Sequence, residues 1–213
     1  MESKNLILGL DVSTKTIGIS IFEDRGDHGK LLVLKHVTPK VKPKPQSKIE
    51  ELVKKVEIFE NEFLNRYADW NITKVIIEEP LLRANNLHTV GTLLKFNGMI
   101  CRSVYRIMGI VPDFISSYDA RAYGFPELMA VRTHKKNGDP YPEKSLKNKK
   151  PTLFGGYPDS VDKKHVIWEK VADMEPQIVW DYTRNKTLAA SSFDMSDSYA
   201  CVLGYKRMMN EWN

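Results

Sequence analysis

Residues 5–22 read NLILGLDVSTKTIGISIF, and this stretch decides the fold. Two β-rich apolar runs, LILGLDV and IGISIFE, flank the turn-like residues STKT, which predicts a β-hairpin. A third run, KLLVLKHV at residues 30–37, predicts another antiparallel strand. The first run carries a lone acid, Asp11, close to its end. The role of Asp11 depends on which other acidic side chains lie beside it in the folded protein.

The rest of the chain alternates helical and strand-like segments. A capping box, Ser47 with Glu50 three residues later, starts a helix after the Pro-rich residues 39–45. TKVIIEEP at 73–80 and VPDFISS at 111–117 read as a fourth and a fifth strand, separated by a long helix at about 86–108. Two helices follow, near 163–173 and 193–209. This order predicts an α/β fold, a mixed five-stranded sheet flanked by helices.

Length and composition favour an ordinary intracellular protein. The 213 residues suit one domain over 1–213. No apolar run approaches the roughly 20 residues of a membrane span, and the N-terminus lacks the pattern of a signal peptide. The two cysteines, Cys101 and Cys201, lie in apolar, helix-like surroundings, so we expect buried thiols in a reducing compartment. We therefore expect a cytoplasmic protein, of a bacterial or phage-infected cell, with no membrane partner.

Basic residues gather in two places. Residues 35–48 hold five lysines and no acid, and residues 132–164 hold nine Lys or Arg against four Asp or Glu. The second stretch is also rich in Pro and Gly, so we expect an insertion or mobile loop at about 132–162. Two separate basic segments favour a phosphate backbone as partner. Within the second, FGGY at 154–157 is interpreted as a plain turn rather than as an aromatic tip that stacks on bases.

Acidic residues follow the predicted core strands without a polar break. Asp11 comes directly after Leu-Gly-Leu, and Glu78 and Glu79 come directly after Val-Ile-Ile. Asp194 and Asp197, three residues apart, are expected to open the last helix on one face. Ligands gather at the carboxyl ends of strands in such sheets, so these groups converge if the first and fourth strands are parallel neighbours. Strand alternation puts Glu78 and Glu79 on opposite faces and leaves open which of them joins.

Clustered carboxylates repel one another, and a hard divalent cation relieves that repulsion. Two Mg²⁺ ions per site, for which Mn²⁺ substitutes, can stabilise the attacking and the leaving oxygen of a phosphodiester. Acidic residues beside basic segments therefore predict metal-assisted phosphodiester hydrolysis.

Three segments together resemble the RuvC-type Holliday junction resolvases of the ribonuclease H-like (retroviral integrase) superfamily. They are ILGLDVSTKTIGISIF, VIIEEPL and DMSDSYACVLGY, at residues 7–22, 75–81 and 194–205. The resemblance covers most of the chain and suggests a divergent, viral or phage-borne branch. It implies that Asp11, Glu78, Asp194 and Asp197 are catalytic metal ligands.

The resemblance also implies a lysine near the scissile phosphate, for which DKKHVIWEKV offers Lys163 or Lys164, with Lys164 preferred. The implied activity is metal-dependent cleavage of branched DNA, above all four-way junctions, by a homodimer. The residues expected to contact DNA are Lys15, Arg83, Asn85, Asn86, Lys135, Lys136 and Lys163.

Two other functions compete with this hypothesis. A non-catalytic DNA-binding member of the same fold is one, although such relatives usually lose an acid. An ATP-binding protein of the sugar kinase or actin type is the other, because those chains also begin with a strand like GLDVSTKTIG. Such proteins need a second phosphate motif and about twice the length, and neither is found.

Overall fold

The structure is a computed structural model that describes residues 4–25, 29–80 and 86–209. Its main sheet has the strand order β3-β2-β1-β4-β5. The strands are β1 (Leu6–Val12), β2 (Ile17–Asp24), β3 (Gly29–Val37), β4 (Ile72–Glu78) and β5 (Asp113–Ile115). β1 pairs antiparallel with β2 and β2 with β3, whereas β4 runs parallel to both β1 and β5. The predicted mixed sheet is confirmed, including the parallel contact of its first and fourth strands.

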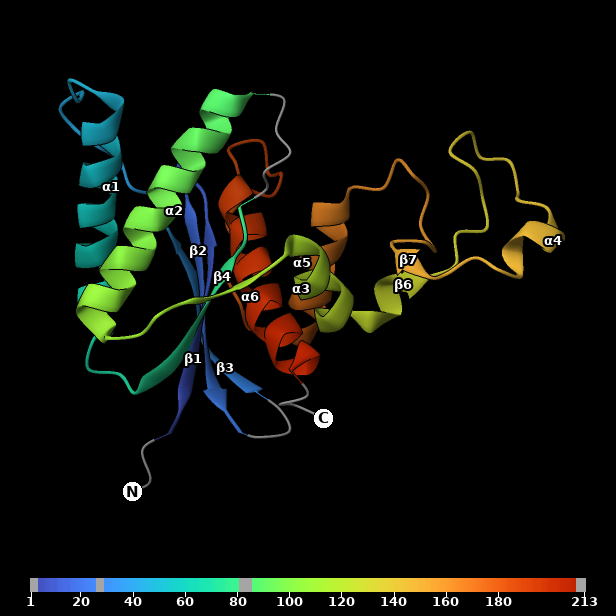
Figure 1. Ribbon diagram of the computed structural model, residues 1–213, viewed down its shortest axis with the longest axis horizontal. Coiled ribbons are helices and arrows are strands. Elements are labelled where there is room, and N and C mark those ends of the chain that lie inside the picture. Colours follow the sequence, from blue (N-terminus) through green and yellow to red (C-terminus); the bar gives the residue numbers. More distant parts are fainter. Residues whose placement is uncertain (1–3, 26–28, 81–85, 210–213) are drawn as a thin grey trace.

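Helices cover both faces of this sheet (Figure 1). One face carries α1 (Lys48–Glu62) and α2 (Leu87–Met108), and the other carries α3 (Ser117–Gly124), α5 (Lys163–Met174) and α6 (Ala190–Met208). Two short 3₁₀ turns are η1 (Leu64–Arg66) and η2 (Pro126–Leu128). The Ser47 hydroxyl accepts the Glu50 backbone N–H at 3.1 Å, as the capping box predicts. In the described part of the chain, no helix combines the length and apolar character of a membrane span.

Strand alternation divides the interior into two cores. On β1, Leu8 and Leu10 pack in the core beneath α1 and α2, while Ile7 packs in the core shared with α6. On β4, Ile77 belongs to the first core and Ile76 to the second. Side chains two residues apart on a strand share a face. The residues that continue the Ile7 and Ile76 rows therefore point toward α6.

Two glycines let α6 lie directly on the hairpin. A Cβ added to Gly18 would lie 1.9 Å from the Asp194 carbonyl oxygen, and one added to Gly9 would lie 2.5 Å from that of Ser198. The Ser20 hydroxyl donates to the same Ser198 carbonyl at 2.8 Å. Only residues without a side chain permit this approach of helix backbone to strand. The approach brings the second turn of α6 close to the end of β1.

The last helix starts earlier than expected. It begins at Ala190 instead of near Phe193. The Ser192 hydroxyl donates to the Asp181 carbonyl and accepts the Asp181 N–H, both at 2.9 Å, which ties the first turn to the preceding segment. The expectation that Asp194 and Asp197 open this helix is therefore wrong, because they lie in its second turn.

The segment between α3 and α5, which includes the basic stretch, has local structure of its own. It contains β6 (Met129–Ala130), α4 (Glu143–Leu146) and β7 (Thr152–Leu153), and β6 pairs antiparallel with β7. Its outer part projects from the α3 and α5 side, away from the sheet (Figure 1). Phe154, directly after β7, is only 2% exposed and packs in the core shared with α6. FGGY therefore forms a turn whose first aromatic ring is unavailable to a nucleic-acid base.

Candidate active site

Three carboxylates from distant parts of the sequence meet at one edge of the sheet. Asp11 lies near the end of β1, Glu78 ends β4, and Asp197 lies in α6. One oxygen from each lies within 4.8 Å of the others. The parallel pairing of β1 with β4 places Asp11 beside Glu78, and the close packing of α6 against the hairpin adds Asp197.

The structure places Glu78, and not Glu79, in this cluster. Ile76 packs against the α6 side of the sheet, and Glu78 lies two residues further on the same row. Glu79 follows the end of β4 and is exposed. The Ser117 hydroxyl, at the start of α3, hydrogen-bonds to the Glu78 carboxylate. The acid is thus fixed from two elements.

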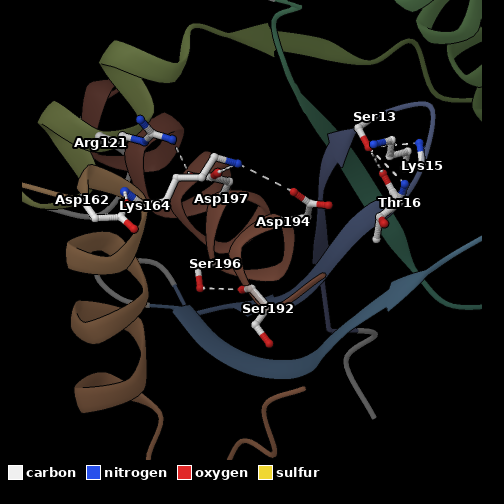
Figure 2. Close-up of polar contacts among 10 residues, drawn as sticks. All are labelled: Ser13, Lys15, Thr16, Arg121, Asp162, Lys164, Ser192, Asp194, Ser196 and Asp197. Atoms are coloured by element: carbon white, nitrogen blue, oxygen red, sulfur yellow. Dashed lines mark hydrogen bonds and ion pairs between the residues drawn. The ribbon is translucent and has the colours of Figure 1, made fainter. Parts of the chain in front are cut away.

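Asp194 lines the same pocket without joining the three-oxygen cluster. It lies on α6 one turn before Asp197, and its Oδ1 is 3.8 Å from the Lys164 Nζ. Figure 2 shows Lys164 reaching from α5 toward both aspartates, and its Nζ lies 3.5 Å from Asp197 Oδ2. Lys163 instead holds its ammonium group 5.9 Å from the centroid of the Phe154 ring. Of the two lysines considered, Lys164 faces the acids.

Arg121 is a site residue that the sequence reasoning missed. Its guanidinium donates to Asp197 Oδ1 at 2.8 Å (Figure 2). The two side chains are only 15% and 4% exposed. Arg121 lies on α3, which follows β5 and begins at the same sheet edge as the acids. The sequence could have predicted its place, because Ser116 in SSYDARAYG is a helix N-cap and the helix it starts follows directly on the fifth strand.

Burial and repulsion from neighbouring acids raise the pKa values of Asp11, Glu78 and Asp194. Burial, with the charges of Glu78, Asp197 and Asp194, raises the pKa of Asp11 well above its usual range. Burial and Asp197 raise the pKa of Glu78 to about 7, although Arg121 opposes this. Burial, opposed by Lys164, raises the pKa of Asp194 to about 6. The positive charges of Arg121 and Lys164 therefore do not balance the negative charges of the four carboxylates that line the pocket.

The donor set fits a divalent cation. The acids line a pocket of about 280 Å³, and every ligand they offer is a hard carboxylate oxygen, as Mg²⁺ and Mn²⁺ prefer. A bound dication would offset the repulsion that raises the pKa values of Asp11 and Glu78. The three clustered oxygens of Asp11, Glu78 and Asp197 are the groups in reach of one ion.

The residues expected to contact DNA lie in several places. Lys15 is exposed in the β1–β2 turn, where its N–H donates to the Ser13 hydroxyl at 3.3 Å (Figure 2). Asn86 caps α2 by accepting the His88 N–H at 2.9 Å. Arg83 and Asn85 lie outside the described residues. Lys135 and Lys136 are exposed in the basic stretch.

No protein-family model and no curated protein sequence matches the chain. The sheet order and its flanking helices define a ribonuclease H-like fold. Among solved structures, Thermus thermophilus RuvC matches with a TM-score of 0.52 and 13% identity over 97% of both chains. The same protein in complex with a Holliday junction substrate matches with a TM-score of 0.58 and 10% identity over 96% of this chain and 95% of that one.

A fowlpox virus resolvase bound to Holliday junction DNA matches with a TM-score of 0.42 and 13% identity over 96% and 98% of the two chains. At these identities, the RuvC structures establish the fold. The ribonuclease H-like fold expected from the sequence resemblance is confirmed.

Proposed function

We propose that this protein is a divalent-metal-dependent endonuclease that cuts branched DNA, with four-way junctions as its main substrate. The observation that carries the proposal is the convergence of Asp11, Glu78 and Asp197 within 4.8 Å, beside two cationic side chains. A buried cluster of carboxylates is costly unless a cation compensates it. The fold of RuvC supports the same activity.

Asp11, Glu78 and Asp197 would hold Mg²⁺, or Mn²⁺ in its place, and Asp194 at the side of the pocket would complete the ligands for a second ion. When bound, these ions supply Lewis acidity and a more acidic water. Asp194, with a pKa of about 6, is mostly ionised at neutral pH and would accept one proton from the attacking water. The water oxygen would bond to phosphorus while the bond from phosphorus to the 3′ oxygen breaks, and that oxygen would take a proton from solvent, leaving a 5′-phosphate and a 3′-hydroxyl.

The two cations have different roles. Half of the Lys164 side chain is exposed, so its ammonium group can meet a phosphate at the mouth of the pocket. Arg121 is enclosed and bonded to Asp197, so it acts as a positioning residue that fixes the orientation of that carboxylate. Because one group contacts substrate and the other does not, their removal has different kinetic effects.

Branched DNA is the substrate that the basic segments favour. Residues 35–48 and 132–164 provide two cationic regions, and Lys15, Arg83, Asn85, Asn86, Lys135, Lys136 and Lys163 are the proposed contacts. A four-way junction has two-fold symmetry, and a homodimer would present two pockets to its two strands. We place this activity in the cytoplasm of a bacterial or phage-infected cell.

The test is cleavage of end-labelled four-way, forked and linear duplex DNA in Mg²⁺. We expect paired nicks in the four-way substrate, and a loss of at least about 100-fold in Glu78→Gln, the order expected when charge stabilisation at a reacting centre is removed. Glu79→Gln is the matched control, because Glu79 borders the same pocket but is exposed and lies outside the three-oxygen cluster, so it should cut far better than Glu78→Gln. Binding of four-way DNA by the wild type without any nick would instead indicate the non-catalytic DNA-binding alternative.

A further inference from the structure

A second cavity lies in the basic stretch, apart from the acids. It has a volume of about 600 Å³, within the range of small-molecule sites. We call it the insertion pocket. Its walls are the hairpin-like residues 132–138 and the turn at residues 155–160. None of these residues lines the pocket that holds Asp11 and Glu78.

The insertion pocket carries unbalanced positive charge. Arg132, His134, Lys135 and Lys136 line it, and among the residues that the structure describes Asp159 is its only acidic lining residue. Asp159 is already engaged in an ion pair with Arg132. Among the described residues, Lys135 and Lys136 form no ion pair, and both are exposed. Two free ammonium groups at the wall of a cavity are suited to a phosphate.

An aromatic ring completes the pocket. Tyr157 lines it and is partly exposed, and its ring stands edge-on to that of Phe154, with 6.1 Å between the centroids. Tyr157 packs against the core shared with α6 and keeps part of its side chain exposed, and an exposed part of a tyrosine ring offers a stacking surface to any base. Cationic groups and an aromatic face together match a nucleotide better than a free phosphate.

The floor of the pocket is fixed to the protein body. The Phe154 N–H donates to the Leu128 carbonyl at 2.8 Å, and the Phe154 ring is buried. A Cβ on Gly155 would lie 1.9 Å from the Ala130 carbonyl oxygen, so this turn lies tightly against β6. The tight packing of this turn therefore fixes the position of Tyr157 in the pocket wall.

The first turn of α5 connects this floor to the acids. Lys163 lies near the Phe154 ring, while its neighbour Lys164 contacts Asp194 and Asp197. A strand whose phosphate meets Lys164 can therefore extend toward the insertion pocket along one side of the molecule.

We propose that the insertion pocket binds one unstacked nucleotide of a DNA strand, with its phosphate on Lys135 and Lys136 and its base on Tyr157. Unstacking costs least where bases are already unpaired, as at a branch point, so this pocket favours branched over linear DNA. The inference rests on the proposed function in taking DNA as the ligand, but its test measures binding separately from cleavage.

The experiment uses the full chain in EDTA and a fluorescent single-stranded oligonucleotide containing 2-aminopurine. Affinity is measured over a series of salt concentrations. Because both lysines contact the same phosphate, Lys135→Gln with Lys136→Gln should lower the salt slope by about 0.7, the value for one neutralised phosphate on a single strand. Tyr157→Leu should weaken binding roughly 5- to 150-fold, the range for one stacked base, and abolish the change in 2-aminopurine emission.

Two matched controls remove the same groups elsewhere. Lys144→Gln with Lys147→Gln takes the same charge from exposed positions of the basic stretch outside the pocket, and Tyr105→Leu removes an exposed ring from α2 on the opposite face of the sheet. Equal losses in a control and its pocket variant, or binding by Tyr157→Leu at wild-type strength, would overturn the proposal.

Cleavage of four-way DNA by the same proteins separates this inference from the proposed function. If the wild type binds through the pocket but never cuts, the nuclease proposal fails and the pocket stands. If the wild type cuts and every pocket variant binds as the wild type does, the pocket proposal fails and the nuclease stands.

Discussion

Replacing Gly18 with alanine tests whether the close packing of α6 against the hairpin positions the acid cluster. The new Cβ would lie 1.9 Å from the Asp194 carbonyl oxygen and 2.3 Å from its carbonyl carbon. These are backbone atoms, so no side chain can rotate away. Ordinary van der Waals contact begins at 3.4 Å, and α6 must move by about 1.5 Å to reach it.

That movement acts on stability and on the site together. Overpacking of this kind costs about 1–3 kcal/mol of unfolding free energy. The second turn of α6 carries Asp194 and Asp197, so the shift separates Asp197 from Asp11 and Glu78. A misplacement of 1 Å can lower a rate roughly 100-fold, and we expect a loss of at least this size in Mg²⁺-dependent cleavage.

The assays are thermal denaturation, calorimetric titration with Mn²⁺ and cleavage of four-way DNA. Gly98→Ala is the matched control, because Gly98 lies in α2 and its new Cβ meets no atom of the described residues within 4 Å. It should gain about 0.5–1 kcal/mol from helix propensity and keep metal binding. Wild-type metal affinity in Gly18→Ala would refute the reasoning that the glycine seat positions the acids.

Three other perturbations follow from the site. Without metal, unfolding should become easier as the pH rises through 7, because Glu78 holds its proton more tightly folded (pKa about 7) than unfolded (4.5); this stabilisation is complete below pH 4.5 and amounts to roughly 3 kcal/mol. The raised pKa values of Asp11 and Asp194 act in the same direction, so Glu78→Gln should remove only the Glu78 share of the difference between denaturant melts at pH 5 and 8.5, and an unchanged difference would contradict the reasoning. Arg121→Met should cost up to about 3–5 kcal/mol in a denaturant melt by leaving Asp197 without its closest cation, whereas Arg121→Lys should recover much of this; equal melts for wild type and Arg121→Met would contradict the pairing. Mg²⁺ or Mn²⁺ at 100 times its Kd should add about 2.7 kcal/mol at pH 8, and Asp11→Asn should lose that gain and cleavage while still binding junction DNA.

The sequence contained most of the information about the sheet. The hairpin and the fourth strand were predicted from short apolar runs bounded by turn residues, and these runs are buried strands in the structure. Alternation alone could not separate Glu78 from Glu79, because a central strand is apolar on both faces. The discriminating fact is tertiary: α6 lies on the face of Ile76, and this follows only from packing.

Other features of the site depended on contacts that no local pattern encodes. The early start of α6 rests on Ser192 bonding to Asp181, across a loop. Arg121 reaches the acids because α3 packs against α6, which involves residues far apart in the chain. The walls of the insertion pocket likewise come together through the pairing of β6 with β7.

That pairing gives the chain a modular character. Ala130 lies opposite Thr152, so the two ends of the segment 131–151 are adjacent on paired strands. The strands and helix that carry the acids are formed entirely outside this segment. A two-residue hairpin turn could replace this segment and join Ala130 directly to Thr152. Residues 131–151 can thus be exchanged for another segment, in evolution or by design, while the carboxylates keep their positions.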